Sequence, residues 1–154
     1  MNDMRSIKIF LFLLLLNGFT GIRSIQAQSD LEIKKVFDRY GNQKGVVMVE
    51  LTGEMLEGYD FSLFKSLMIK ENPEAADYIR KSLAKDETGA KKVKQVVANG
   101  KATSIYLQLP PKGKYHRLIL FNEANKPEHV ITLIYIESKD DSENVLKLIL
   151  KKNK

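Results

Sequence analysis

Hydrophobic residues recur at helical spacing in three stretches of this chain, and each stretch predicts a helix. The three helices are expected over residues 31–40, from residue 73 to about residue 85, and over residues 142–150. A side chain that can cap the helix stands before each one: Ser29 or Asp30, Asn72, and Asp141 or Ser142. The residues expected to face inward are Leu31, Val36, Phe37 and Tyr40, then Ala76, Ile79 and Leu83, then Val145, Leu146 and Ile149.

Alternating or β-branched apolar residues predict the strands. These are expected over residues 46–51, 66–70, 91–97, 101–109, 114–121 and 129–137, the second being short and the last four forming a meander. Residues 53–64 are ambiguous, because two glycines indicate a turn and two phenylalanines indicate packing. The order of elements predicts an α+β fold with a mainly antiparallel sheet of about five strands and helices packed on one face.

The turns of the meander decide which side chains share a face. Asn99-Gly100 is a strong hairpin signal, but a two-residue loop there would place lysines on the core face. A three-residue loop with Gly100 in the left-handed region instead pairs Lys92 with Tyr106. A four-residue loop at residues 110–113 then completes the meander. It places His116 on the core face with Leu107, Leu118 and Leu120, and it places Tyr106 opposite Arg117.

The last predicted strand, HVITLIYIE, is apolar on both faces. Val130, Ile134 and Ile136 lie on one face, and Ile131, Leu133 and Tyr135 lie on the other. Such a strand is either central with both faces covered or part of an interface. Because the predicted helices cover one face only, contact with a partner or a homodimer is the second expectation.

Residues 1–27 have the three parts of a cleavable signal peptide. Arg5 and Lys8 give a weakly positive start, the apolar run IFLFLLLL follows, and a polar stretch ends at Ala27. The apolar run is shorter than the ~20 residues of a membrane span, so no transmembrane segment is expected in the mature chain. We expect cleavage near Ala27, a periplasmic or extracellular location, and one domain over residues 28–154.

Charge is unevenly distributed along the chain, which carries 25 basic and 19 acidic residues in total. Residues 88–122 hold seven basic residues and no acidic one. The simplest explanation is a solvated sheet face that lysines keep soluble and unpaired. The alternative is a surface that binds an anionic envelope component or an acidic protein partner, whereas nucleic acid is disfavoured for an exported protein. Its candidate residues are Lys92, Lys94, Tyr106, Tyr115, Arg117 and Tyr135.

The order of elements resembles small secreted bacterial proteins that are grouped as domains of unknown function. The matching stretches are VFDRYGNQKGVVMVEL, SLMIK, and HVITLIYIES running into SENVLKLIL. The resemblance implies a bacterial, cell-envelope-associated protein with this fold, and it implies no site residue. Many such proteins are lipoproteins, but this chain has no cysteine to acylate and none to form a disulfide.

No residue pattern in the sequence predicts catalysis. The two histidines, His116 and His129, lie on different strands, and His116 is expected to be a structural residue of the core. The sequence has no nucleophile motif and no glycine-rich phosphate loop, so no cofactor or metal is expected. The leading hypothesis is a non-catalytic envelope protein that binds through its outer sheet face. The alternatives are a hydrolase whose site assembles in space and a purely structural role.

Overall fold

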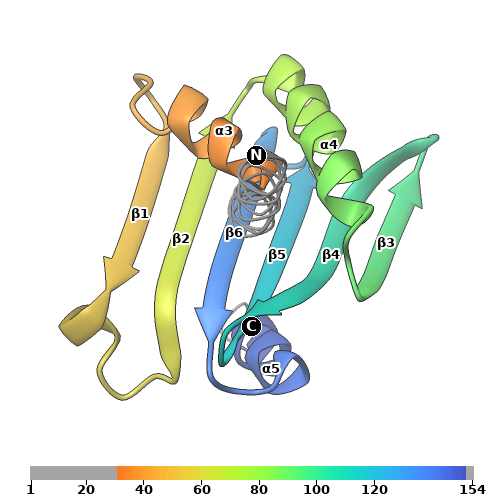
Figure 1. Cartoon of the computed structure of the whole chain (residues 1–154). Helices are drawn as coiled ribbons and strands as arrows, with labels where there is room; N and C mark the ends of the chain where they lie inside the picture. Colours follow the sequence, from red (N-terminus) through yellow and green to blue (C-terminus); the bar gives the residue numbers. More distant parts are fainter. Residues whose placement is uncertain (1–30, 152–154) are drawn as a thin grey trace, which may run out of the picture. The chain divides into compact units, whose positions relative to one another are not determined.

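A computed structural model describes residues 31–151, in which a compact unit begins at Glu32 (Figure 1). Its elements are α3 (Glu32–Tyr40), β1 (Val47–Thr52), the 3-10 helix η1 (Gly53–Leu56), β2 (Phe61–Lys70), α4 (Pro73–Glu87), β3 (Lys92–Ala98), β4 (Lys101–Lys112), β5 (Tyr115–Ala124), β6 (Val130–Ser138) and α5 (Ser142–Lys151). The strands form one antiparallel sheet in the order β1-β2-β6-β5-β4-β3. The α+β class is confirmed, with six strands rather than about five. The predicted signal peptide lies outside the residues described.

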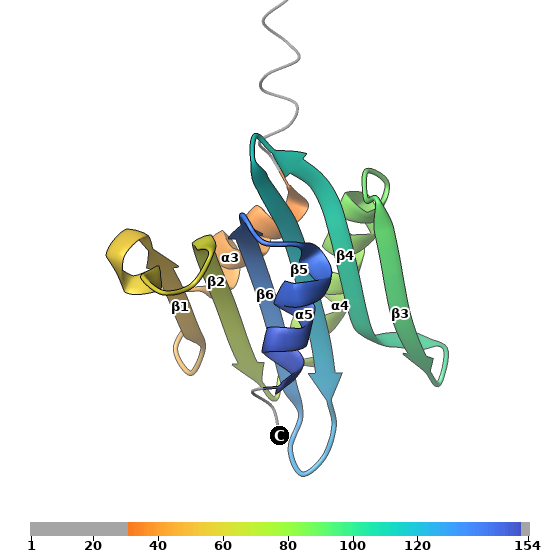
Figure 2. The same cartoon turned by 90° about the horizontal axis from the view of Figure 1, so that it is seen from below.

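The helices lie on both faces of the sheet, so the prediction of helices on one face is wrong. Helices α3 and α4 cover one face, and α5 lies on the opposite face (Figure 2). The physical reason is that the central strands are apolar on both sides. In β6, Ile131 and Leu133 face α3 and α4, whereas Ile136 packs with Val145 of α5. Strand β6 is therefore central and covered on both faces, which was one of the two alternatives predicted for this strand.

The cap expected at Asn72 is present. The Asn72 side-chain oxygen accepts a hydrogen bond from the Ala75 amide at 3.0 Å, and Pro73 occupies the first turn of α4. The same helix also caps its neighbour α3. Buried Asp86, near the end of α4, accepts hydrogen bonds from the Glu32 and Ile33 amides at 2.8 and 3.1 Å. These contacts satisfy the first donors of α3 and hold the two helices together.

The β3–β4 hairpin has a different register from the predicted one. Asn99 and Gly100 both have positive φ, at 51° and 75°, and form a two-residue turn between Ala98 and Lys101. A bulge then adds Thr103 to β4, so that Lys94, not Lys92, pairs with Tyr106. The left-handed Gly100 is confirmed, and the three-residue loop is wrong. The bulge keeps Lys94 off the α4 side, whereas the sequence predicted a longer loop for this purpose.

The predicted loop over residues 110–113 is also wrong. Strand β4 continues to Lys112, which pairs with Tyr115, and Tyr106 pairs with Leu120 rather than lying opposite Arg117. This shift turns β5 over relative to the prediction. Hydrophobic sorting could not detect the difference, because β4 and β5 both carry apolar residues on both of their faces.

No helix within residues 31–151 is long and apolar enough to cross a membrane.

Candidate functional site

The six residues predicted to share a binding face lie on two different faces of the sheet. Strand pairing places Lys94 and Tyr106 on the α5 side, where Tyr106 packs with Leu118, Ile136 and Val145, and the Lys92 backbone pairs with Gln108. Alternation along β5 and β6 places Tyr115, Arg117 and Tyr135 on the side of α3 and α4. The turned-over β5 strand is the cause of this separation. The predicted surface therefore does not exist as one face.

Three of these six side chains are also buried. Tyr106, Arg117 and Tyr135 are 6, 7 and 9% exposed, so none of them forms an outer surface. Arg117 Nε donates a hydrogen bond to the Pro110 carbonyl at 2.7 Å, and the Tyr135 hydroxyl donates one to Glu137 at 2.8 Å. Burial raises the pKa of Tyr135 well above its usual range, and the Glu137 hydrogen bond acts in the same direction. Lys94 Nζ lies 5.8 Å from the centre of the Tyr106 ring.

His116 lies on the α5 side of β5, as Leu118 and Leu120 do, and its side chain is partly buried. This part of the prediction for His116 agrees with the structure. Leu107, which was expected to share that face, pairs with Ile119 on the opposite one.

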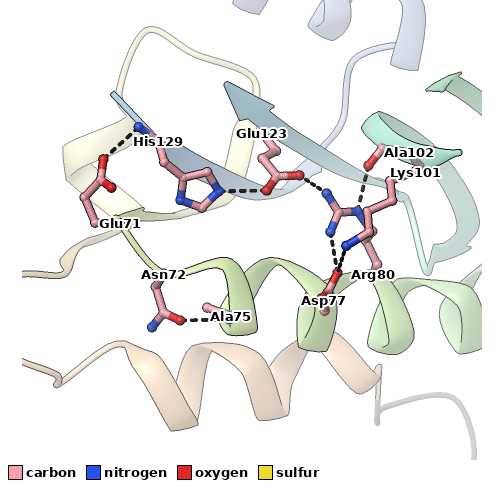
Figure 3. A network of polar contacts seen from close by, with 9 residues as sticks. All are labelled: Glu71, Asn72, Ala75, Asp77, Arg80, Lys101, Ala102, Glu123 and His129. Atoms are coloured by element: carbon pink, nitrogen blue, oxygen red, sulfur yellow. Dashed lines mark hydrogen bonds and ion pairs between the residues drawn. The ribbon is translucent and has the colours of Figure 1, made fainter. Parts of the chain in front are cut away.

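A polar network that the sequence did not predict joins α4 to the sheet (Figure 3). His129 Nε2 lies 2.7 Å from Glu123, whose second carboxylate oxygen forms an ion pair with Arg80 of α4. Arg80 also contacts Asp77 at 2.9 Å, and Lys101 of β4 lies 3.3 Å from the same Asp77 oxygen. At the centre of the network, the His129 and Glu123 side chains are 12 and 10% exposed.

The chemistry of this network indicates a structural clamp. Arg80 Nε also donates a hydrogen bond to the Ala102 carbonyl at 2.8 Å, so one guanidinium binds α4, β4 and β5 together. His129 Nδ1 is buried without a hydrogen-bond partner among the residues described. Within residues 31–151, no group of three or more metal-ligating side chains comes together.

An apolar groove lies on the α5 side of the sheet. Its volume is about 610 Å³, within the range of ligand pockets. None of the described residues that line it carries a charge. The apolar lining residues are Tyr59, Phe61, Phe64, Met68, Leu120, Phe121, Ile134, Leu148 and Ile149, and the polar ones are Ser104, Asn122 and Thr132. The polar groups form one cross-strand row over β4, β5 and β6, because Asn122 pairs with both of the others.

The apolar surface continues beyond the groove onto the edge of the sheet. Val47 and Val49 of β1 pair with Met68 and Ser66 of β2, so they face the α5 side. They are 58 and 37% exposed, and Met68 is 41% exposed. The other side of β1 carries Glu50, which forms an ion pair at 3.1 Å with Lys65. The polar side of this strand thus faces α3, and its apolar side faces solvent.

The sequence pattern predicted part of this apolar surface. The alternation of Val47, Val49 and Leu51 was visible, as was the packing expected of Phe61 and Phe64. Nothing in the pattern showed that these residues lie on the face that α5 covers only in part.

The comparisons with known proteins identify a family. The model of a Family of unknown function (DUF6108) matches residues 21–149. No curated protein and no solved structure matches the chain.

Proposed function

This chain belongs to DUF6108, a family of unknown function, and we propose that it is a non-catalytic binding module that holds an apolar segment of a partner protein on the α5 side of its sheet. The observation that carries the proposal is the uncharged groove and its continuation over β1 and β2. Contiguous exposed apolar surface of this kind marks interaction sites in soluble domains.

A protein segment suits this surface better than an anionic ligand does. Among the described residues that line the groove, none is charged and could pair with an anion, and the basic residues of the segment 88–122 are not among them. The exposed apolar residues also extend past the groove to Val47, which pairs with Met68 on the same face. A small ligand would fill the groove and leave this flat part uncovered, whereas a segment with several apolar side chains would cover both.

The location of this function follows from the N-terminal sequence. We propose that the protein acts in a bacterial cell envelope or outside the cell after cleavage near Ala27. Mass spectrometry of the protein from its native host should show a mature N-terminus near Gln28. A soluble protein that keeps Met1 would contradict export.

The groove is tested with Nile red, an uncharged dye that fluoresces in apolar sites. Met68→Asp and Leu148→Asp place a charge at its rim, where the two residues are 41 and 49% exposed, and each should weaken dye binding about tenfold. Val96→Asp is the matched control, because Val96 is 60% exposed on β3 and does not line the groove. Equal loss of dye binding in all three variants would show that the dye binds exposed apolar residues in general rather than the groove.

The partner is tested by site-specific photo-crosslinking in the host cell. A photoreactive phenylalanine at Tyr59, which is 50% exposed at the rim, should give one adduct of defined mass, and Met68→Asp in the same chain should abolish it. The same photoreactive residue at Val96 should give no such adduct. If only dye and no protein occupies the groove, the proposal of a protein partner is wrong.

A further inference from the structure

The two edges of the sheet differ in how they are protected. Strand β3 carries Lys92 and Lys94, and its pairing with β4 is interrupted by a bulge. Lysines and bulges are the usual devices that keep an edge strand from pairing with another chain. Strand β1 has neither: its sequence is VMVELT, and it pairs with β2 without a register shift. The one charged residue of β1, Glu50, forms an ion pair with Lys65.

Symmetry restricts how a second copy could pair with this edge. Antiparallel pairing about a two-fold axis normal to the sheet keeps each face on its own side, so paired positions must differ by an even number. Centring on Glu50 would set two carboxylates directly opposite each other, which is unfavourable. Centring on Met48 would leave only a short overlap of the two strands. Centring on Val49 pairs Val47 with Leu51 and Met48 with Glu50, and no like charges meet.

The residues beyond both ends of β1 fit the same register. The chain turns at Gly45 and at Gly53, both of which have positive φ. With Val49 on the axis, exposed Lys44 of one copy comes to the end of the strand where exposed Glu54 of the other copy lies. The symmetry repeats this opposite-charge pair at the other end.

We infer that two copies of this chain pair through β1, antiparallel and centred on Val49, to form one continuous twelve-stranded sheet. The inference rests on the edge of β1 and not on the groove, so it goes beyond the proposed function. Because the two-fold axis is normal to the sheet, the exposed apolar residues of both copies lie on the same face of the joined sheet. The dimer would thus offer two grooves to partners on one side.

Disulfide trapping tests the axis directly, because the chain contains no cysteine. Residues opposite each other in antiparallel strands have Cα atoms roughly 4.5–5.5 Å apart, within the range that a disulfide can bridge. Val49→Cys in the protein as processed by its host should therefore oxidise to a covalent dimer. Val93→Cys is the matched control, since Val93 has the same 37% exposure on the other edge strand, and it should stay monomeric. Crosslinking at Val93 alone, or equally at both positions, would overturn the inference.

Charge exchange tests the register without new covalent bonds. In sedimentation analysis, Lys44→Glu should weaken dimerisation, and Lys44→Glu together with Glu54→Lys should restore it, because each pair then reverses its signs. Val49→Lys should raise the dimer dissociation constant by at least about tenfold by opposing two lysines on the axis, whereas Val93→Lys should leave it unchanged. A protein that is monomeric at all concentrations is inconsistent with the dimer. That result would leave the groove proposal standing, because dye binding and partner crosslinking are measured at other residues.

Discussion

At the residue scale, Asp86 shows how a single carboxylate joins two helices. It caps α3 through two backbone amides although it belongs to α4, and it is buried at this junction. Burial raises the pKa of Asp86 above its usual range, and the two hydrogen bonds oppose that effect without cancelling it. The folded protein therefore holds a proton on Asp86 at pH values where the unfolded chain has already released it.

This shift predicts a pH-dependent effect of Asp86→Asn. Because the folded pKa is raised, the wild type loses stability relative to the variant as the pH rises from the ordinary aspartate value through the folded value. Urea unfolding at a series of pH values on both sides of the ordinary aspartate pKa of about 3.9 should show the difference growing in favour of Asn as the pH rises. Asp77→Asn is the control with the opposite sign, because the Lys101 hydrogen bond lowers the pKa of Asp77. Parallel pH profiles of the two variants would contradict a raised pKa of Asp86.

The clamp between α4 and the sheet predicts a large loss of stability for Glu123→Gln. The substitution leaves the little-exposed Arg80 guanidinium without its buried carboxylate, and breaking such a pair costs about 3 kcal/mol. Glu128→Gln is the matched control, because its ion pair with Lys70 is half-exposed and is worth at most about 1 kcal/mol. Urea unfolding of both variants measures the difference. Equal losses would show that Glu123 is not part of a buried clamp.

At the scale of elements, helices were easier to predict than strand register. The pattern located α3, α4 and α5 closely, and it identified the residues that pack inward, Val145 among them. Register failed at the β3–β4 and β4–β5 hairpins for different reasons. At β3–β4, a bulge shifts the pairing by two residues, which leaves the same side chains on each face. At β4–β5, both strands bury apolar residues on both faces, so hydrophobic sorting does not distinguish the observed register from one that turns β5 over. The candidate surface failed with it, because it depended on that register.

The β3–β4 turn gives a prediction at this scale. Gly100 has a φ of 75°, and a Cβ added there would meet no atom within 4 Å, so only the backbone conformation opposes a side chain. Gly100→Val should therefore cost roughly 1 kcal/mol, and Gly100→Asn should cost less. Gly89→Ala is the control, because that glycine is equally unhindered and its φ is not positive. Thermal unfolding of the three variants should rank them in this order, with Gly89→Ala close to wild type.

At the scale of the whole molecule, the groove exists because α5 is short and the sheet is wide. Helix α5 packs on residues of β4, β5 and β6, and Phe61 and Phe64 of β2 pack against the same cluster. On this face, Val47 and Val49 of β1 and Met68 of β2 stay exposed. The sequence alone could not predict this arrangement, since it requires knowing that β6 lies between β2 and β5. That position places Phe64 next to Ile136 and lets two segments about seventy residues apart form one wall of the groove.

The place of β6 in the sheet also bears on how the chain is made and moved. Strand β6 pairs with β2 on one side and with β5 on the other. The β1–β2 part of the sheet therefore cannot join the β3–β4–β5 part until residues up to 138 are available. Folding must therefore wait for nearly the whole chain and close a long loop, which makes it slow. A protein secreted through a narrow channel has to cross it unfolded. If the protein is exported as proposed, the late central strand would keep the chain unfolded and able to pass through such a channel until residues up to 138 have been made.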